Sequence, residues 1–168
     1  MSVVKKINKL SQSEFIKVFA NIFENSSWIA SDLYKEKPFG NFENLSSKIL
    51  AIFDNATKDQ QLKILNVHPD LADKIKIDSL SLDSKKEQIN AELDQCTEKE
   101  LNEFKDLNYK YKKRFGFPFI YAVKGKSKIE ILSNFRQRVS CDINVEFNEA
   151  KKQVKKIANL RLNEINKK

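Results

Sequence analysis

One local pattern occurs four times in this chain and limits its fold more than any other feature: a Ser or Thr is followed three positions later by Glu or Gln. The four pairs are Ser11 with Glu14, Thr57 with Gln60, Ser84 with Glu87, and Thr97 with Glu100. In such a capping box, each side chain accepts a hydrogen bond from the backbone N–H of the other residue at a helix start. The pattern therefore predicts four helix starts.

Apolar side chains recur at helical spacing, and the alternation typical of strands is almost absent. The clearest stripes are Phe15/Val18/Phe19/Phe23, Leu45/Ile49/Ile52/Phe53 and Leu101/Phe104/Leu107/Tyr111/Phe115. We expect helices near residues 12–23, 28–36, 42–55, 58–67, 85–95, 98–115, 127–140 and 143–165. At 168 residues, the chain has the length of one domain, so we predict an all-α fold in which residues 1–168 form a single compact bundle of about eight helices.

The segment 116–123 is expected to be a buried, extended connection. Gly116 suits the position after a helix end, and Pro118 lacks the backbone donor that a continuing helix needs. The residues that follow are mostly apolar. A buried extended segment must find partners for its backbone N–H and C=O groups, and a bound ligand can be one of these partners.

The composition argues against several classes of site. Cys96 and Cys141 form no C-x-x-C motif, and we expect both to be reduced inside a cell. His68 is the only histidine, which excludes a His-rich metal site, so no metal is predicted. The three glycines form no G-x-G-x-x-G or P-loop motif, which argues against nucleotide cofactors. No apolar run approaches the ~18 residues of a membrane span and no signal-peptide pattern opens the chain, so we expect a soluble intracellular protein with no membrane partner.

Charge is distributed unevenly along the chain. Residues 1–104 contain 14 Lys and Arg against 17 Asp and Glu, whereas residues 105–168 contain 17 against 6. A basic end can attract nucleic acid, an acidic partner or a small anion, but it can also be a solvated lysine-rich surface. No basic region with a zipper and no helix-turn-helix pattern is present, so a nucleic-acid-binding module is the second hypothesis and not the first.

Three side chains could carry chemistry, and each has a structural alternative. His68 precedes a proline, so a helix should end at or just before it, where the helix dipole favours the protonated imidazole. Such a group suits acid–base catalysis, although it could simply cap the helix. Glu87 completes a capping box, which would explain its carboxylate without catalysis. Arg161 interrupts an apolar run and could either reach solvent or face inward as a fixed fork for an anion or carbonyl.

Longer sequence blocks place these residues in a recognisable order. The blocks are His68-Pro69-Asp70-Leu71-Ala72, Ser84-x-x-Glu87-Gln88, Leu107-Asn108-x-x-Tyr111-x-x-Arg114-Phe115-Gly116-Phe117-Pro118-Phe119-Ile120, Ala122-Val123-Lys124-Gly125, Glu146-Phe147-x-x-Ala150 and Ile157-Ala158-x-Leu160-Arg161-Leu162. From about Leu10 to Ile165, the chain closely resembles the 2-oxo-4-hydroxy-4-carboxy-5-ureidoimidazoline (OHCU) decarboxylases of purine breakdown. The first block and the F-G-F-P-F-I block are each specific.

This resemblance implies a cofactor-free, all-helical, usually homodimeric enzyme that converts OHCU into (S)-allantoin and carbon dioxide. It implies that His68 is the catalytic acid and that Glu87 is its companion carboxylate. It also implies substrate contacts from Pro69, from the turn Ser84, Lys85, Lys86, Glu87 and Gln88, from the backbone of Phe119, Ile120, Tyr121, Ala122 and Val123, and from Arg161.

The chain departs from the family pattern at two positions. Asp73 follows the first block where many members have glycine, and Ala91-Glu92-Leu93 stands where Ala-Gly-Leu is common. An inactive relative that serves as an interaction domain is a third hypothesis, which the intact His68, Glu87 and Arg161 disfavour. The chain lacks an S-K-L-like ending, and the lysines of its last helix should form a solvated face, so we expect a cytoplasmic protein.

Overall fold

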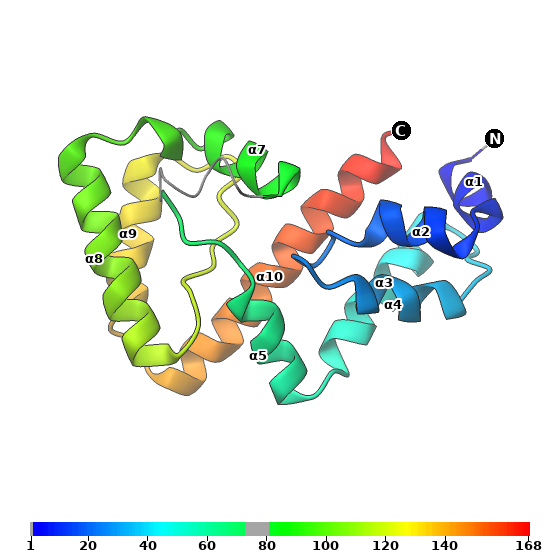
Figure 1. Cartoon of the computed structure of the whole chain (residues 1–168), viewed down its shortest axis with the longest axis horizontal. Helices are drawn as coiled ribbons and strands as arrows, with labels where there is room; N and C mark the ends of the chain where they lie inside the picture. The colour runs from blue at the N-terminus through cyan, green and yellow to red at the C-terminus, as the bar shows by residue number, and fades with distance from the viewer. Residues whose placement is uncertain (1, 73–80) are drawn as a thin grey trace. The chain divides into compact units, whose positions relative to one another are not determined.

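The computed structural model describes residues 2–72 and 81–168, and these residues form helices, turns and extended connections (Figure 1). The helices are α1 Val3–Lys9, α2 Gln12–Phe19, α3 Ser27–Lys35, α4 Phe42–Asp54, α5 Lys58–Asn66, α7 Leu82–Asn90, the 3-10 helix η1 Leu93–Gln95, α8 Glu98–Phe115, α9 Lys128–Arg138 and α10 Ile143–Asn166. Because the described residues contain helices and no β-strand, the predicted all-α class is confirmed. The departure at Asp73 lies outside the described residues. None of the described helices is long and apolar enough to cross a membrane.

The chain divides into two compact units. The first comprises residues 1–64 and 155–168, and the second comprises residues 65–154. Helix α10 contributes its first half to the second unit and its second half to the first. The single domain expected for residues 1–168 stays a prediction.

Aromatic residues form the core of the first unit. The rings of Phe15 and Phe19 on α2 stack with their centroids 4.5 Å apart, and Phe23 stacks on Phe53 of α4 at 4.9 Å. All four side chains are almost completely buried. Burial of one such ring stabilises the fold by about 1.5–3 kcal/mol, so both stacks contribute to the stability of this unit.

Tyr111 of α8 lies at the centre of the core of the second unit. Its ring contacts four phenylalanine rings at centroid distances of 4.5–5.9 Å, namely Phe115, Phe117, Phe119 and Phe135. Phe119 also stacks on Phe135 of α9 at 3.8 Å. The extended segment after α8 therefore supplies core side chains although it is not a helix or strand. As predicted, this segment is extended, and most of its side chains are buried.

Three of the four predicted capping boxes are confirmed, those of Ser11, Thr57 and Thr97. The fourth is wrong. Helix α7 starts three residues earlier than the Ser84 box predicts, because Ser81 accepts a hydrogen bond from the backbone N–H of Ser84 at 3.2 Å and is the true cap. Ser84 is consequently a buried residue of the first helical turn. A further capping box, Ser127 with Glu130, begins α9 and was not predicted.

The helix predicted over residues 12–23 is too long, because α2 ends at Phe19. The apolar stripe that continues to residue 23 caused this error. Ile22 and Phe23 are buried in the turns that follow, and Asn25 adopts the left-handed conformation with φ 46°. Apolar residues at helical spacing therefore indicate which side chains are buried. They do not show that the backbone between these residues is helical. Helix α1 was missed for a related reason, since only Val4 and Ile7 of its seven residues are buried.

The helix expected over 85–95 ends at Asn90, because Glu92 has left-handed backbone angles of φ 59° and ψ 22°. This conformation costs an L-residue roughly 1–2 kcal/mol, whereas glycine adopts it freely. The position is one of the two at which the chain departs from the family pattern.

We therefore expect the substitution Glu92→Gly to raise the free energy of unfolding by roughly 0.5–1 kcal/mol, since the relief of backbone strain exceeds the entropy that glycine adds to the unfolded chain. Urea denaturation measures this change. Glu98→Gly, which makes the same chemical change in the first turn of α8, serves as the control and should be destabilising. A destabilising Glu92→Gly would contradict the strain argument.

Candidate active site

His68 lies directly after α5, as the sequence predicted. Helix α5 ends at Asn66, and the backbone N–H of His68 closes a turn onto the carbonyl oxygen of Leu65 at 3.2 Å. The imidazole side chain is largely buried, with 9% of its residue surface exposed, and Pro69 is half-buried beside it. The only histidine of the sequence thus lies at the start of the non-helical segment 68–72, which we call loop 68–72.

Two helices of the second unit hold this loop by its backbone. The side chain of Gln88 on α7 donates to the carbonyl oxygen of Asp70 at 3.2 Å and accepts from the N–H of Ala72 at 3.0 Å. From α8, Asn108 donates to the carbonyl oxygen of Leu71 at 3.1 Å. Lys112 forms an ion pair with the Asp70 carboxylate at 2.7 Å. These contacts fix the conformation of loop 68–72, although it has no regular secondary structure.

We expect Gln88→Met to lower the free energy of unfolding by about 1–3 kcal/mol, because it leaves the buried N–H of Ala72 without its hydrogen-bond acceptor. Thermal denaturation followed by circular dichroism measures the change. Asn90→Met, at an exposed position of the same helix, should alter stability by no more than about 0.5 kcal/mol. Equal stabilities of the two variants would show that Gln88 does not hold the loop.

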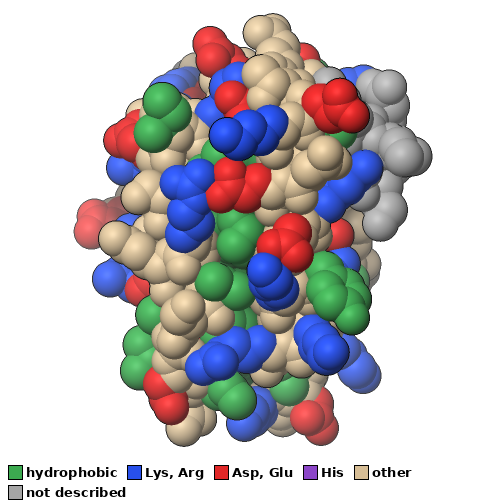
Figure 2. Space-filling view, turned by 90° about the vertical axis from the view of Figure 1, so that its left-hand side faces the viewer, with side chains coloured by type: hydrophobic (Ala, Val, Ile, Leu, Met, Phe, Trp, Pro, Cys, Tyr) green, Lys and Arg blue, Asp and Glu red, His purple; other side chains and the backbone are tan. Residues whose placement is uncertain are grey.

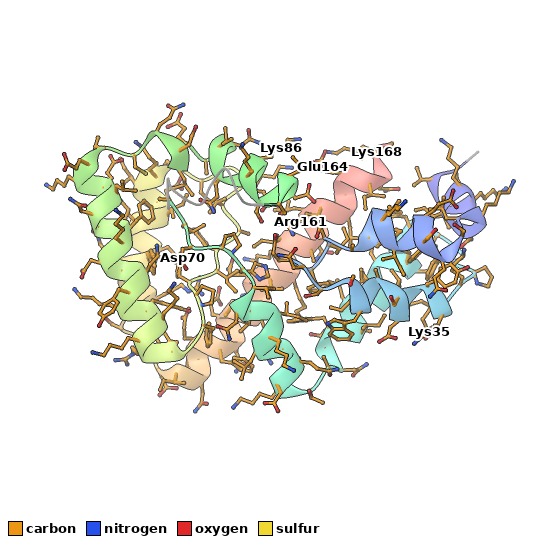
Figure 3. All side chains as sticks on the ribbon, in the orientation of Figure 1. Lys35, Asp70, Lys86, Arg161, Glu164 and Lys168 are labelled. Carbon is orange, nitrogen blue, oxygen red and sulfur yellow. The ribbon has the colours of Figure 1, made fainter. Side chains whose placement is uncertain are left out.

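The predicted residues on α7 have different environments. Ser84 and Gln88 are buried one turn apart, and Lys85 and Glu87 are half-buried. Lys86 is exposed (Figure 3). Because Ser81 caps the helix, Glu87 is not part of a capping box, so the capping-box explanation for its carboxylate is wrong. The side chain of Gln88 is engaged by the His68 loop, and its contact with substrate stays a prediction.

The predicted backbone segment Phe119–Val123 is also in the second unit. Phe119, Ile120 and Val123 are buried, whereas Tyr121 and Ala122 are half-buried. Side chains of α9 and α10 bond to its backbone at Ile120 and Ala122. The segment therefore has fixed peptide orientations, which a site built from backbone donors and acceptors requires.

Arg161 belongs to the first unit and lies on the second half of α10 (Figure 3). Its guanidinium donates to the carbonyl oxygen of Asn21 at 2.7 Å and to the carboxylate of Glu24 at 3.0 Å. The side chains of Arg161 and Glu24 are only 5% and 3% exposed. Of the two orientations considered from the sequence, the inward one is therefore correct. Its contact with substrate stays a prediction.

The basic surface of α8 and α9 contains acidic partners for several of its cations (Figure 2). A cavity of about 540 Å³ there is lined by Leu107, Lys110, Lys113, Arg114, Arg136, Val139 and Ser140. Lys110 pairs with Asp106 at 2.6 Å, and Arg136 pairs with Glu103 at 2.5 Å. These pairs interrupt the positive charge, which agrees with a solvated surface better than with a nucleic-acid interface. Both cysteines are free, as expected.

Sequence reasoning did not assign a role to Asn108, Arg138 or Gln153, which hold backbone segments of the site region. One signal was present for Arg138: it continues the apolar stripe of Ile131 and Phe135 at helical spacing, so a charged residue occupies a core position. Asn108 and Gln153 are single polar residues on otherwise apolar helix faces, a pattern too common to identify a site.

Comparison with known proteins agrees with the resemblance. A model of the OHCU decarboxylase family matches residues 8–163. The 2-oxo-4-hydroxy-4-carboxy-5-ureidoimidazoline decarboxylase of Haloferax volcanii is 34% identical over 161 residues, which are 96% of this chain and 94% of that protein. The uric acid degradation bifunctional protein of Bacillus sp. (strain TB-90) is 40% identical over 98% of this chain, which spans 32% of that longer protein.

Solved structures show the same fold. The crystal structure of (S)-allantoin synthase superposes with a TM-score of 0.79 at 30% identity, covering 98% of this chain and 54% of that chain. A crystal structure of OHCU decarboxylase in the presence of (S)-allantoin superposes with a TM-score of 0.71 at 22% identity, covering 89% of this chain and 97% of that chain, and supports the fold alone. Together with the family match over nearly the whole chain, these findings show that the chain belongs to the OHCU decarboxylase family.

Proposed function

We propose that this protein decarboxylates OHCU to (S)-allantoin and carbon dioxide without a cofactor. The family match over residues 8–163 carries this proposal. The buried His68 after α5 and the held loop 68–72 support it, because acid catalysis requires a proton donor in a fixed position. Asp70, whose carboxylate is paired with Lys112, belongs to the support of this loop.

The chemistry of the substrate explains why no electron sink beyond the substrate is needed. The carbon that loses carbon dioxide carries a hydroxyl group and adjoins a C=N bond. When the C–C bond breaks, its electron pair forms a double bond to the neighbouring carbon, and the electrons of the C=N bond move to nitrogen. The nitrogen takes up a proton, which gives a neutral enol. The enol then becomes a carbonyl group as its hydroxyl releases a proton and the neighbouring carbon takes one up. A single enantiomer forms only when this proton arrives on one face.

In this proposal, His68 delivers the proton to that face and Glu87 orients the imidazole and supports its charged form. Pro69, the residues Ser84–Gln88 and the backbone of Phe119–Val123 contact the substrate. Arg161 is proposed to bind a carbonyl oxygen of the substrate, or the hydroxyl oxygen as it becomes a carbonyl. A tight clamp on the departing carboxylate would instead stabilise the starting state, which slows the reaction.

The test uses OHCU generated freshly from urate by the upstream enzymes, with circular dichroism at the absorption band of allantoin. Addition of this protein should speed the appearance of optically active (S)-allantoin. Racemic allantoin formed at the spontaneous rate would contradict the proposed function. A crystal structure with a carboxylate-free, allantoin-like ligand tests Arg161, whose role is wrong if it does not touch that ligand.

The homodimer and the cytoplasmic location implied by the sequence are part of the same proposal. Sedimentation equilibrium at micromolar concentration should give twice the chain mass of 19.6 kDa. A monomer at this concentration would contradict the dimer, and import of a fluorescent fusion into an organelle would contradict the location.

A further inference from the structure

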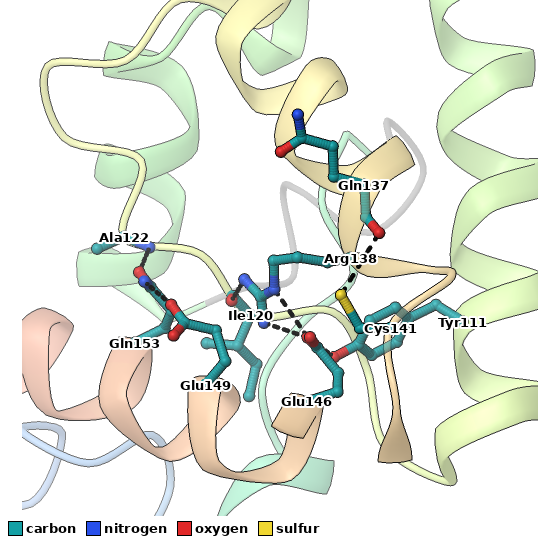
Figure 4. A network of polar contacts seen from close by, with 9 residues as sticks. All are labelled: Tyr111, Ile120, Ala122, Gln137, Arg138, Cys141, Glu146, Glu149 and Gln153. Carbon is teal, nitrogen blue, oxygen red and sulfur yellow. Dashed lines mark hydrogen bonds and ion pairs between the residues drawn. The ribbon is translucent and has the colours of Figure 1, made fainter. Parts of the chain in front are cut away.

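Two side chains from different helices bond to the backbone of the extended segment at Ile120 and Ala122 (Figure 4). These two residues flank Tyr121 in the sequence. Arg138 of α9 donates from Nη1 to the carbonyl oxygen of Ile120 at 2.7 Å. Gln153 of α10 accepts, through Oε1, a hydrogen bond from the backbone N–H of Ala122 at 3.0 Å. These backbone groups belong to the two peptide planes that meet at the Cα of Tyr121. Two side-chain hydrogen bonds therefore restrain the peptide planes on both sides of Tyr121.

This arrangement also sets the directions of the polar groups of Tyr121 itself. In a trans peptide, the C=O and N–H groups point to opposite sides. Because Arg138 holds the C=O of Ile120, the N–H of Tyr121 points away from the guanidinium. Because Gln153 holds the N–H of Ala122, the C=O of Tyr121 points away from that amide. The N–H of Tyr121 is thus a donor on the side away from Arg138, and the C=O of Tyr121 is an acceptor on the side away from Gln153.

A buried polar network immobilises Arg138. Its Nε and Nη2 donate to one carboxylate oxygen of Glu146 at 2.8 and 2.5 Å, and the hydroxyl of Tyr111 donates to the same oxygen. The three side chains are at most 7% exposed. Burial, and then the neighbouring carboxylate of Glu146, raise the pKa of the Tyr111 hydroxyl, which therefore stays a neutral donor. The guanidinium carbon also lies 4.5 Å from the ring centroid of Phe119.

Gln153 is oriented in a similar way. Its Nε2 donates to a carboxylate oxygen of Glu149 at 2.6 Å, so its Oε1 is directed to the N–H of Ala122. The side chain of Gln153 is 3% exposed. Each side chain that holds the segment is therefore itself held by a carboxylate on α10, Glu146 or Glu149.

We propose that Arg138 and Gln153 are positioning residues that fix the peptide planes around Tyr121 and thereby the geometry with which this segment binds substrate. This inference rests on the proposed function, in which the backbone of Phe119–Val123 contacts OHCU. Neither residue needs to touch substrate. Their effect is transmitted through the backbone, so it should appear in substrate affinity and product stereochemistry while the protein remains folded.

The first test is the double variant Arg138→Met/Glu146→Gln, which removes both buried charges together. Replacement of a whole buried ion pair is often tolerated, whereas removal of one partner leaves an uncompensated charge. The control is Arg136→Met/Glu103→Gln, which makes the same changes in an exposed pair that also involves α9. We expect the buried double variant to show a KM about tenfold higher and a lower enantiomeric excess of (S)-allantoin, because one hydrogen bond that orients the segment is lost. The control should match the wild type.

The second test is Gln153→Met, which keeps the shape of the side chain and removes the hydrogen bond to Ala122. Amide hydrogen exchange measured by NMR should be about tenfold faster at Ala122, with unchanged exchange in the middle of α8. This readout does not depend on catalysis. It also remains decisive if the double variant fails to fold.

The outcomes separate this inference from the proposed function. A merely structural role would lower the amount of active enzyme and leave KM and enantiomeric excess at wild-type values, which would overturn the inference. Unchanged exchange at Ala122 in Gln153→Met would overturn it as well. If the wild-type protein does not turn over OHCU, the proposed function fails, and the exchange rate at Ala122 still decides whether Gln153 holds the segment.

Discussion

Replacement of His68 by Ala is expected to lower the rate of (S)-allantoin formation by about 10²–10⁴-fold, the range typical of a lost general acid or base. The reason is that decarboxylation alone gives an enol, and the enzyme must still deliver a proton to one face of the neighbouring carbon. His68 is the only histidine and is held, largely buried, beside a loop bonded to both α7 and α8. Stopped-flow circular dichroism with freshly generated OHCU measures the rate.

The neighbouring substitution Val67→Ala provides the control, because Val67 is 41% exposed and precedes the imidazole by one residue. It should leave the rate within about twofold of the wild type, as expected for a surface substitution. In the His68→Ala variant, the remaining product should be racemic, since spontaneous protonation has no preferred face. Wild-type production of (S)-allantoin by His68→Ala would remove His68 from the mechanism.

The second large effect is expected on stability, for Glu24→Leu in the first unit. This substitution removes the Glu24 carboxylate from the buried ion pair with Arg161, and loss of one member of a buried ion pair costs about 3–5 kcal/mol. The carbonyl oxygen of Asn21 still accepts a hydrogen bond from Arg161 but carries no net charge. Urea denaturation, analysed as free energies of unfolding, measures the loss.

Two comparisons make this prediction specific. Asp54→Leu breaks the exposed ion pair with Lys155 in the same unit, and such pairs contribute at most about 1 kcal/mol. The double variant Glu24→Leu/Arg161→Met removes both buried charges and should recover most of the stability that Glu24→Leu loses. If Arg161 contacts substrate as proposed, this stable double variant should nevertheless be a poor enzyme. A double variant with wild-type kcat/KM would show that Arg161 serves stability alone.

Helix α8 shows what could be predicted from neighbouring residues. The sequence predicts a helix over 98–115, and the structure has the helix at Glu98–Phe115. Thr97 and Glu100 form the capping box at its start, and Gly116 adopts φ 78° at its end. Both signals act over at most four residues, so they do not depend on the rest of the fold.

Helix α7 shows where such local signals are ambiguous. Ser81 and Ser84 are both suitable caps and lie three residues apart. The cap at Ser81 lets the helix bury Ser84 together with Gln88, whose amide then bonds the His68 loop. The choice between the two serines therefore depends on the contacts of Gln88 with Ala72 and Asp70, which lie 16 and 18 positions earlier in the sequence. A local sequence pattern does not contain this information.

The all-α class, most helix boundaries, the extended segment after Gly116 and the family could be predicted from the sequence. They follow from hydrogen bonds between near neighbours, from apolar spacing and from short sequence blocks. The polar side chains that hold the site could be identified only in the folded structure. Arg138 meets Ile120 across 18 residues, and Asn108 meets Leu71 across 37. A buried backbone carbonyl can accept a hydrogen bond from any donor that packing brings within about 3 Å. Which donor this is depends on the packing of the whole unit, so neighbouring residues in the sequence do not determine it.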